Sequence, residues 1–97
     1  MRVHPLATRE THKTADWYDK DSPTRGDRFV DQVEYALRRI RENPNIGELN
    51  DRGERKLLLR KFPYKVVYRT EGERIFVVAV AHQKRRDGYW RRRQASW

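Results

Sequence analysis

The sequence predicts an α+β protein in which an N-terminal helical hairpin packs on an antiparallel sheet of three or four strands and a basic C-terminal tail follows. Two observations favour this class. Apolar residues recur at a helical period up to residue 42, and a period of two takes over from residue 55. Helices packed on one face of an antiparallel sheet make an α+β domain. We expect residues 1–97 to form one domain, since domains generally span roughly 50–250 residues.

The first half of the chain is expected to hold two helices. Residues 1–5 form either a short first strand or a loose end, because Pro5 stops a long strand there. Residues 6–20 predict a helix, followed by a loop at residues 21–23. Residues 23–42 give the clearest helical signal, and Ser22 before Pro23 looks like an N-cap followed by proline at the first helical position. The apolar stripe of this second helix contains Phe29, Val30, Val33, Ala36, Leu37 and Ile40.

The second half is expected to be a loop, three strands and a tail. Residues 43–53 are rich in Asn and Gly and predict a loop. Residues 55–61, 64–70 and 74–82 predict strands, the last two joined by a hairpin turn at residues 71–73. Residues 74–82 are nearly all apolar, which favours a strand covered on both faces, by the protein alone or by helices on one face and a partner on the other. Residues 83–97 form a basic tail with Tyr89, Trp90 and Trp97, with room for a short helix.

The expected core joins the helices to the central strand. From the helices it includes Trp17, Tyr18, Phe29, Val33, Leu37 and Ile40. From the strand it includes Phe76, Val78 and Val80, or the alternate residues.

The composition indicates an anionic partner. Lys and Arg total 23 against 14 acidic residues, a net charge of +9, which favours nucleic acid, the ribosome, a membrane surface or an acidic protein without choosing among them. The sequence has no Cys, which excludes disulfides and thiolate metal sites. It shows no signal-peptide apolar region and no apolar run near the ~20 residues that span a bilayer. We therefore expect a soluble cytoplasmic protein.

Motifs spread over nearly the whole chain resemble those of the RelE/ParE superfamily of toxins. In order, they are His4-Pro5-x-Ala7 with Glu10, Ala15-Asp16-Trp17-Tyr18, Asp21-Ser22-Pro23 with Phe29 and the helix from Val33 to Ile40, Asn43-Pro44, Arg60-x-Phe62-Pro63-Tyr64-x-Val66-x-Tyr68-Arg69, Val80-Ala81-His82, Arg85 or Arg86, and Tyr89-Trp90 with Arg93. The resemblance implies the toxin of a type II toxin–antitoxin pair and a cognate antitoxin with an acidic segment that wraps it. It leaves two mechanisms open, because some members cleave mRNA on the ribosome and others poison DNA gyrase without being enzymes.

The candidate catalytic residues suit RNA cleavage without a metal or other cofactor. Arginine and lysine can bind phosphates and stabilise a developing negative charge. Histidine can act as general acid or base, and a tyrosine can assist proton transfer where neighbouring cations lower its pKa. The candidates are Arg60, Lys61, Arg69, His82, Arg85 and Tyr89. Each has a competing structural or partner-binding interpretation. Arg60 and Lys61 would keep a strand edge soluble, and Arg69 would form an ion pair with Glu71 or Glu73. His82 would hydrogen-bond at the sheet edge, Arg85 would bind antitoxin carboxylates, and Tyr89 would pack on the sheet.

A second set of cations is expected to contact nucleic acid or the antitoxin. These residues are Arg55, Lys56, Lys84, Arg86, Arg91, Arg92 and Arg93. In the tail, aromatic residues interleave with arginines, which suits base stacking on single-stranded RNA. The competing interpretation is that Trp90 packs back on the sheet and that the arginines bind antitoxin carboxylates.

Three functions therefore compete. The first is a ribosome-dependent mRNA endonuclease that uses a subset of the candidate catalytic residues. The second is a non-enzymatic gyrase poison that acts through the helical hairpin and the basic tail. The third is a general nucleic-acid-binding module, for which the charge of +9 would suffice.

Overall fold

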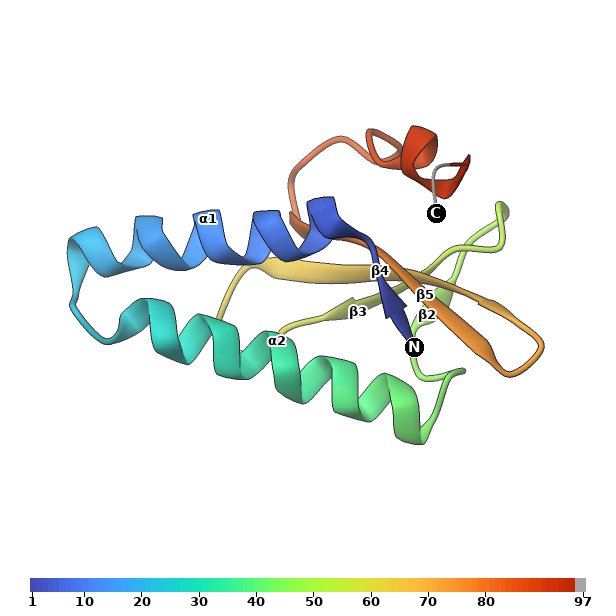
Figure 1. Cartoon of the computed structure of the whole chain (residues 1–97), viewed down its shortest axis with the longest axis horizontal. Helices are drawn as coiled ribbons and strands as arrows, with labels where there is room; N and C mark the ends of the chain where they lie inside the picture. The colour runs from blue at the N-terminus through green and yellow to red at the C-terminus, as the bar shows by residue number, and fades with distance from the viewer. Residues whose placement is uncertain (96–97) are drawn as a thin grey trace.

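The computed structural model describes residues 1–95, so Trp97 of the expected tail lies outside it. The elements are β1 (Arg2–Val3), α1 (Pro5–Asp21), α2 (Arg25–Glu42), β2 (Glu48–Leu49), β3 (Arg55–Leu58), β4 (Tyr64–Glu71), β5 (Arg74–His82) and a short 3-10 helix, η1 (Arg91–Ala95). The strands form a five-stranded sheet in the order β1-β5-β4-β3-β2, with the helical hairpin packed beside it (Figure 1). The α+β class and the helical hairpin are confirmed.

The sheet has more strands than expected because two short ones join its edges. β1 forms and runs parallel to β5, which resolves the alternative left open for residues 1–5. β2 lies inside the predicted loop 43–53 and pairs antiparallel with β3. Both strands have two residues, which is too short to produce an alternating pattern in the sequence. The other strand pairs are antiparallel, as expected.

The start of the second helix differs from the sequence prediction. Ser22 does not cap α2; it ends α1, where its backbone N–H donates to the carbonyl oxygen of Tyr18 at 3.1 Å. α2 begins after Thr24, and the Gly26 N–H donates to Asp19 Oδ1 across the turn at 2.8 Å. The carboxylate of α1 thus binds a free N–H at the start of α2, a task that usually belongs to the N-cap side chain. Neither helix is long and apolar enough to cross a membrane, within the described residues.

The helix-facing core is largely the expected one. Tyr18, Phe29, Val33 and Ile40 are buried, and Leu37 packs half-buried beside them. Trp17 was expected in the core and is 62% exposed, so that prediction is wrong. Neighbouring residues on a helix point about 100° apart, and Tyr18 takes the inward place, where its ring contacts Phe29 and Phe62.

A β-bulge in β5 changes which residues face the helices. Val67 lies opposite Ala79 and Tyr68 lies opposite Val77, so Val78 is an extra residue between them. Such an extra residue disrupts the pairing locally and shifts the alternation of side chains. The sequence left two alternating sets of core residues open for this strand. One set is correct for the half of β5 before the bulge, and the other is correct for the half after it. The residues packed with the helices are Ile75, Val77 and Val80, and those on the other face are Val78, Ala79 and Ala81.

The strand expected at residues 55–61 stops at Leu58. The chain turns at residues 59–63, where the Leu59 N–H donates to the Tyr64 carbonyl oxygen at 2.9 Å. Lys61 adopts a left-handed backbone with φ of 68°, a conformation that costs a non-glycine residue roughly 1–2 kcal/mol. Arg60 and Lys61 therefore lie in the loop between β3 and β4, not on a strand face.

Replacing Gly26 by alanine is predicted to destabilise the helical hairpin. A Cβ atom there would lie 2.4 Å from the carbonyl oxygen of Ala15 and 2.5 Å from Asp19 Oδ1, so the two helices would have to separate. We expect the free energy of unfolding to fall by about 1–3 kcal/mol, the usual cost of overpacking, in a urea titration followed by circular dichroism. Gly72→Asn is the control, because Gly72 has φ of 58° with open space around it and Asn tolerates that backbone. Unchanged stability of Gly26→Ala would contradict the tight helix contact.

Candidate functional site

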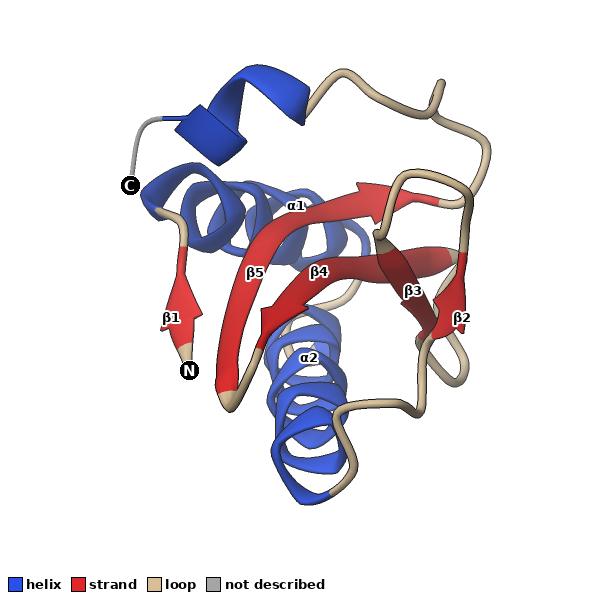
Figure 2. Cartoon of the chain, turned by 90° about the vertical axis from the view of Figure 1, so that its right-hand side faces the viewer, coloured by secondary structure: helices blue, strands red, loops and turns tan. Residues whose placement is uncertain are grey.

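The tail covers the face of the sheet that the helices leave open. Trp90 is fully buried and packs with the outward-facing residues of β4 and β5, which are Val67, Val78, Ala79 and Ala81. Tyr89 packs partly buried beside it. The apolar β5 is thus covered on both faces by the protein itself, which is one of the two arrangements expected from its composition. Figure 2 shows the tail helix and α2 on opposite sides of the molecule.

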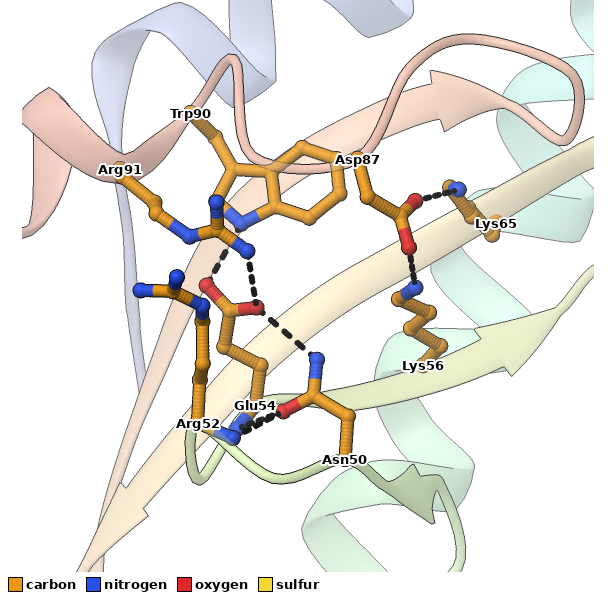
Figure 3. A network of polar contacts seen from close by, with 8 residues as sticks. All are labelled: Asn50, Arg52, Glu54, Lys56, Lys65, Asp87, Trp90 and Arg91. Carbon is orange, nitrogen blue, oxygen red and sulfur yellow. Dashed lines mark hydrogen bonds and ion pairs between the residues drawn. The ribbon is translucent and has the colours of Figure 1, made fainter.

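A buried carboxylate anchors Trp90 (Figure 3). Glu54 is 1% exposed, and its Oε2 accepts a hydrogen bond from Trp90 Nε1 at 2.8 Å. Its Oε1 accepts from Asn50 Nδ2 at 3.0 Å and lies 3.9 Å from an Arg91 nitrogen. A buried charge is tolerated where hydrogen bonds and an opposite charge replace water. The contacts of Glu54 therefore fix the start of the tail helix against the loop before β3.

The loop that carries Glu54 is ordered by the side chain of Asn50. The Asn50 Oδ1 accepts the backbone N–H groups of Arg52 and Glu54 at 2.9 and 3.0 Å, an arrangement that Asn favours in turns. Gly53 adopts φ of 78° inside the same turn, which glycine does without steric cost. Asn50 and Gly53 thus orient the Glu54 side chain toward the tail.

Asp87 holds the other end of the tail through two lysines. Its carboxylate oxygens accept from Lys56 Nζ and from Lys65 Nζ, the latter at 2.8 Å. The hydrogen bond from Lys56, followed by that from Lys65, lowers the pKa of the Asp87 carboxyl. Both ammonium groups also lie over the Trp90 ring, at 6.0 and 5.5 Å from its centroid, within the range of a cation–π interaction. Lys65 is buried, so these contacts satisfy a cation that water cannot reach.

Glu10 of α1 ties the tail to the edge of β5. It accepts from the Tyr89 hydroxyl and from both terminal nitrogens of Arg93, at 2.8 and 3.1 Å. It also accepts from the Val80 N–H at 3.1 Å, while Arg93 donates to the Val78 carbonyl oxygen at 3.2 Å. β1 pairs with β5 at Phe76 and Val77. Beyond these residues, the Glu10–Arg93 pair hydrogen-bonds the backbone groups of β5 that a longer β1 would otherwise bind.

Burial raises the pKa of the Tyr89 hydroxyl, and the hydrogen bond to Glu10 raises it further, against the smaller effects of Arg93 and Arg85. The sequence reasoning expected neighbouring cations to lower this pKa. The Arg85 guanidinium does lie over the ring, 3.8 Å from its centroid, yet burial and the carboxylate outweigh it. At neutral pH Tyr89 is therefore a protonated donor to Glu10.

The other candidate catalytic residues lie apart from the tail. Arg60 is exposed, with its guanidinium 5.7 Å from the Tyr35 ring centroid on α2. Lys61 lines a shallow groove of about 550 Å³ beside the start of α2. Arg69 lies 3.9 Å from Glu71 Oε1, an ion pair that the sequence had suggested. Of the six candidates, Arg85 and Tyr89 contact each other.

His82 ends β5 at a second groove, of about 690 Å³. Its Nδ1 accepts the Lys84 N–H at 3.0 Å, and its ring stacks edge-on against Tyr64. The exposed Trp17 lines the same groove. The residues lining this groove are Lys13, Thr14, Trp17, Tyr18, Asp21, Arg25, Pro63, Tyr64 and His82.

The cations expected to contact nucleic acid or the antitoxin fall into two groups, those bonded to other groups of the chain and those left exposed. Arg55 donates to the carbonyl oxygens of Asn45 and Gly47 at 3.1 and 2.8 Å. Lys56, Arg91 and Arg93 bind carboxylates of the chain itself, as described above. The exposed members of the tail set with no ion pair to a carboxylate in the described chain are Lys84, Arg86 and Arg92, and these can contact a partner.

Sequence reasoning missed the three carboxylates that organise the tail. Glu54 and Asp87 carried no assignment, and Glu10 entered only as part of a motif. Their partners lie 36, 31 and 79 residues away along the chain, so no local spacing reveals them. The available signal was the aromatic pair Tyr89-Trp90 in a polar tail, since a buried indole N–H and a buried phenol each need an acceptor.

The arrangement offers anion binding more readily than proton transfer. Within residues 1–95, no three metal-ligating side chains converge. The candidate general acid–base groups His82 and Tyr89 belong to different environments, a groove beside α1 and a partly buried network that joins the tail to Glu10. General acid–base catalysis requires both groups within hydrogen-bonding reach of one substrate.

Comparison with known proteins gives two findings. The family model described as "ParE toxin of type II toxin-antitoxin system, parDE" matches residues 1–87. A solved structure described as the chromosomal ParDE TA system from P. aeruginosa matches with a TM-score of 0.73 at 18% sequence identity, covering 84% of this chain and 91% of that chain; at this identity the likeness concerns the fold. No curated protein sequence matches the chain.

Removing the Trp90 side chain is predicted to release the tail. Trp90→Ala deletes a fully buried indole and takes one hydrogen-bond donor from the buried Glu54. We expect the free energy of unfolding to fall by about 3–5 kcal/mol in a denaturant titration. Brief trypsin treatment should also cut near Lys84, Arg85 and Arg86 faster than in the native chain.

Trp17→Ala is the matched control, because it deletes the same side chain from a position that is 62% exposed. We expect its stability to change by about 1 kcal/mol or less, with no change in cleavage of the tail. Equal stability losses in the two variants would contradict the tail packing described above.

Proposed function

The chain belongs to the family of ParE toxins of type II toxin–antitoxin systems, and from this membership we propose that it inhibits growth as a non-enzymatic poison of DNA gyrase. It is the toxin component of such a system, and a cognate antitoxin is its partner. We propose that the antitoxin presents an acidic segment and that both proteins act in the cytoplasm. Toxins that resemble this chain either poison gyrase or cleave mRNA on the ribosome, so the choice depends on the site.

The environment of Tyr89 is the observation that favours gyrase poisoning over mRNA cleavage. Its hydroxyl donates to Glu10, its pKa is raised by burial, and Arg93 completes the network. An RNase mechanism would need this hydroxyl, or a group beside it, to move a proton to or from the substrate. A partly buried donor that is already bonded to the Glu10 carboxylate is poorly suited to that task. The network is better suited to hold the tail as a rigid surface.

The distribution of the remaining candidates supports the same choice. Arg60 and Lys61 lie in the loop after β3, Arg69 lies near the end of β4, and His82 lies at the groove beside α1. Phosphate cleavage would require such groups to converge on one phosphate. A gyrase poison requires no such convergence, because it acts by binding.

The exposed Trp17 suits a protein contact. Its indole lies at the rim of the groove that also contains Tyr64 and His82. An aromatic side chain beside a concave surface is typical of residues that dominate protein–protein binding energy. We propose that this groove, on the helical hairpin, contacts gyrase.

The exposed tail cations suit the antitoxin. Lys84, Arg86 and Arg92 belong to the tail, whose helix lies on the opposite side of the molecule from α2 (Figure 2). Acidic residues of a wrapping segment would pair with them, and such pairing speeds association more than it raises affinity.

Ribosome-dependent mRNA cleavage is the alternative, and one observation favours it. His82 lies in a groove with Lys13 and Arg25, and a histidine beside two cations can serve phosphate chemistry near neutral pH. In this alternative His82 would be the acid or base, and the lysine and arginine would bind the phosphate.

The double variant Tyr89→Phe/His82→Gln separates the two mechanisms. It removes both proton-transfer groups and keeps both side-chain volumes close to native. We expect it to arrest growth and to trap cleaved gyrase–DNA complexes within about threefold of the native toxin, because binding alone is needed. The measurements are induced-growth curves and a gyrase cleavage assay, with mRNA in a reconstituted translation reaction run alongside.

Trp17→Ala is the companion variant and should reduce gyrase poisoning by at least tenfold while folding normally. Loss of growth arrest in the double variant, together with mRNA cut by the native toxin only when ribosomes are present, would overturn the gyrase proposal and establish the endonuclease.

A further inference from the structure

We propose that the outer face of α2, with the loop between β3 and β4, is a binding surface for the phosphate backbone of duplex DNA. The surface, named here the α2 basic strip, consists of Arg28, Arg38, Arg39, Arg60 and Lys61. The inference deepens the proposed gyrase mechanism, in which the target is a gyrase–DNA complex, and its biological role rests on that mechanism.

Three guanidinium groups of the strip gather around one aromatic ring. Arg38, Arg39 and Arg60 each lie 5.7 Å from the centroid of Tyr35. The negative face of the ring attracts each cation, but the three like charges near one another repel. An anion bound among them would relieve that repulsion. Because Tyr35 belongs to α2 and Arg60 to the loop, the ring also joins the two elements into one surface.

The second part of the strip lies beside the start of α2. Arg28 and Lys61 line the groove of about 550 Å³ together with Arg25 and a carboxylate, that of Asp31. The left-handed backbone of Lys61 is the kind of local strain that often marks a functional residue. Arg25 already pairs with Asp21 at 3.0 Å, and for this reason it is not counted in the strip.

The strip differs from the cations around Trp90 and Tyr89 in how its charges are balanced. Arg93 of the tail binds Glu10, and Lys65 of β4 binds Asp87. In the described part of the chain, by contrast, no strip residue forms an ion pair with a carboxylate. Uncompensated cations on a folded surface raise the affinity for an anionic partner. The strip therefore offers positive charge to a partner, most of all where Arg38, Arg39 and Arg60 gather around Tyr35.

The spacing of the cations along the strip matches the regular spacing of phosphates along a DNA strand. Arg28 and Arg39 are separated by about 16 Å of helix axis at a rise of ~1.5 Å per residue, which roughly equals five phosphate steps of one DNA strand at ~3.4 Å each. A rigid helix holds these cations at fixed spacing, which suits the fixed spacing of duplex phosphates.

The same ring argues against single-stranded nucleic acid. Proteins that bind single strands stack bases on exposed aromatic side chains. Tyr35 is the aromatic residue of the strip, and three guanidinium groups already lie near it. Contact with phosphates along a duplex is therefore favoured over base stacking.

Removal of three strip charges should weaken duplex binding. The variant Arg28→Gln/Arg38→Gln/Arg60→Gln is compared with Arg9→Gln/Arg52→Gln/Arg74→Gln, which removes the same charge from exposed residues outside the strip. Binding of a fluorescein-labelled 20-base-pair duplex is followed by anisotropy from 50 to 300 mM NaCl. We expect the strip variant to bind at least tenfold more weakly, with a slope of log K against log salt shallower by about 3, since each phosphate contact contributes roughly 0.9.

The control variant should stay within about threefold of the native chain, and a lysine version of the strip variant should recover the slope. Thermal melting establishes that all variants fold. An equal loss in the control, or tighter strip-dependent binding of a single-stranded RNA 20-mer or of a polyglutamate peptide, would overturn the proposal. The assay contains no gyrase, so it can succeed where gyrase poisoning fails. Intact poisoning with no strip-dependent duplex binding would refute this inference alone.

Discussion

The packing of the tail on the second face of the sheet is the constraint on which the structure depends. The helical hairpin covers one face of β4 and β5, and the other face contains Val67, Val78 and Ala81 with no helix of the hairpin against it. Trp90 supplies the missing layer and is held by the buried carboxylate of Glu54. A small domain buries a limited share of its surface, so this layer contributes a large part of the apolar burial.

This packing also decides how the charges are used. Glu10, Glu54 and Asp87 lie against cations of the sheet and tail, so these three carboxylates pair with cations of the chain itself. Unpaired cations then remain on the exposed part of the tail and in the α2 basic strip, although α2 as a whole carries five arginines and four carboxylates. The uneven distribution favours two separate anionic partners, duplex DNA at α2 and an acidic antitoxin at the tail.

Most of the fold was predictable because it depends on local patterns. The stripe of the second helix and the apolar β5 are signals within one element, and both gave correct elements. The bulge at Val78, the two-residue strands and the outward position of Trp17 were not predictable, because each depends on pairing or packing between distant segments. Of the candidate site, the basic residues were found by composition. Their roles were beyond reach, because the carboxylates that bind them are distant in sequence.

Amide hydrogen exchange tests most directly whether the tail is a structural layer. The Arg91 and Arg93 N–H groups donate to the carbonyl oxygens of Gly88 and Trp90 at 3.1 and 2.9 Å. If the tail is packed as described, these amides exchange slowly and lose protection when Trp90 is replaced by alanine. Rapid exchange of both amides in the native chain, with β5 fully protected, would contradict the account, because the tail would then be a mobile segment available for catalysis or binding.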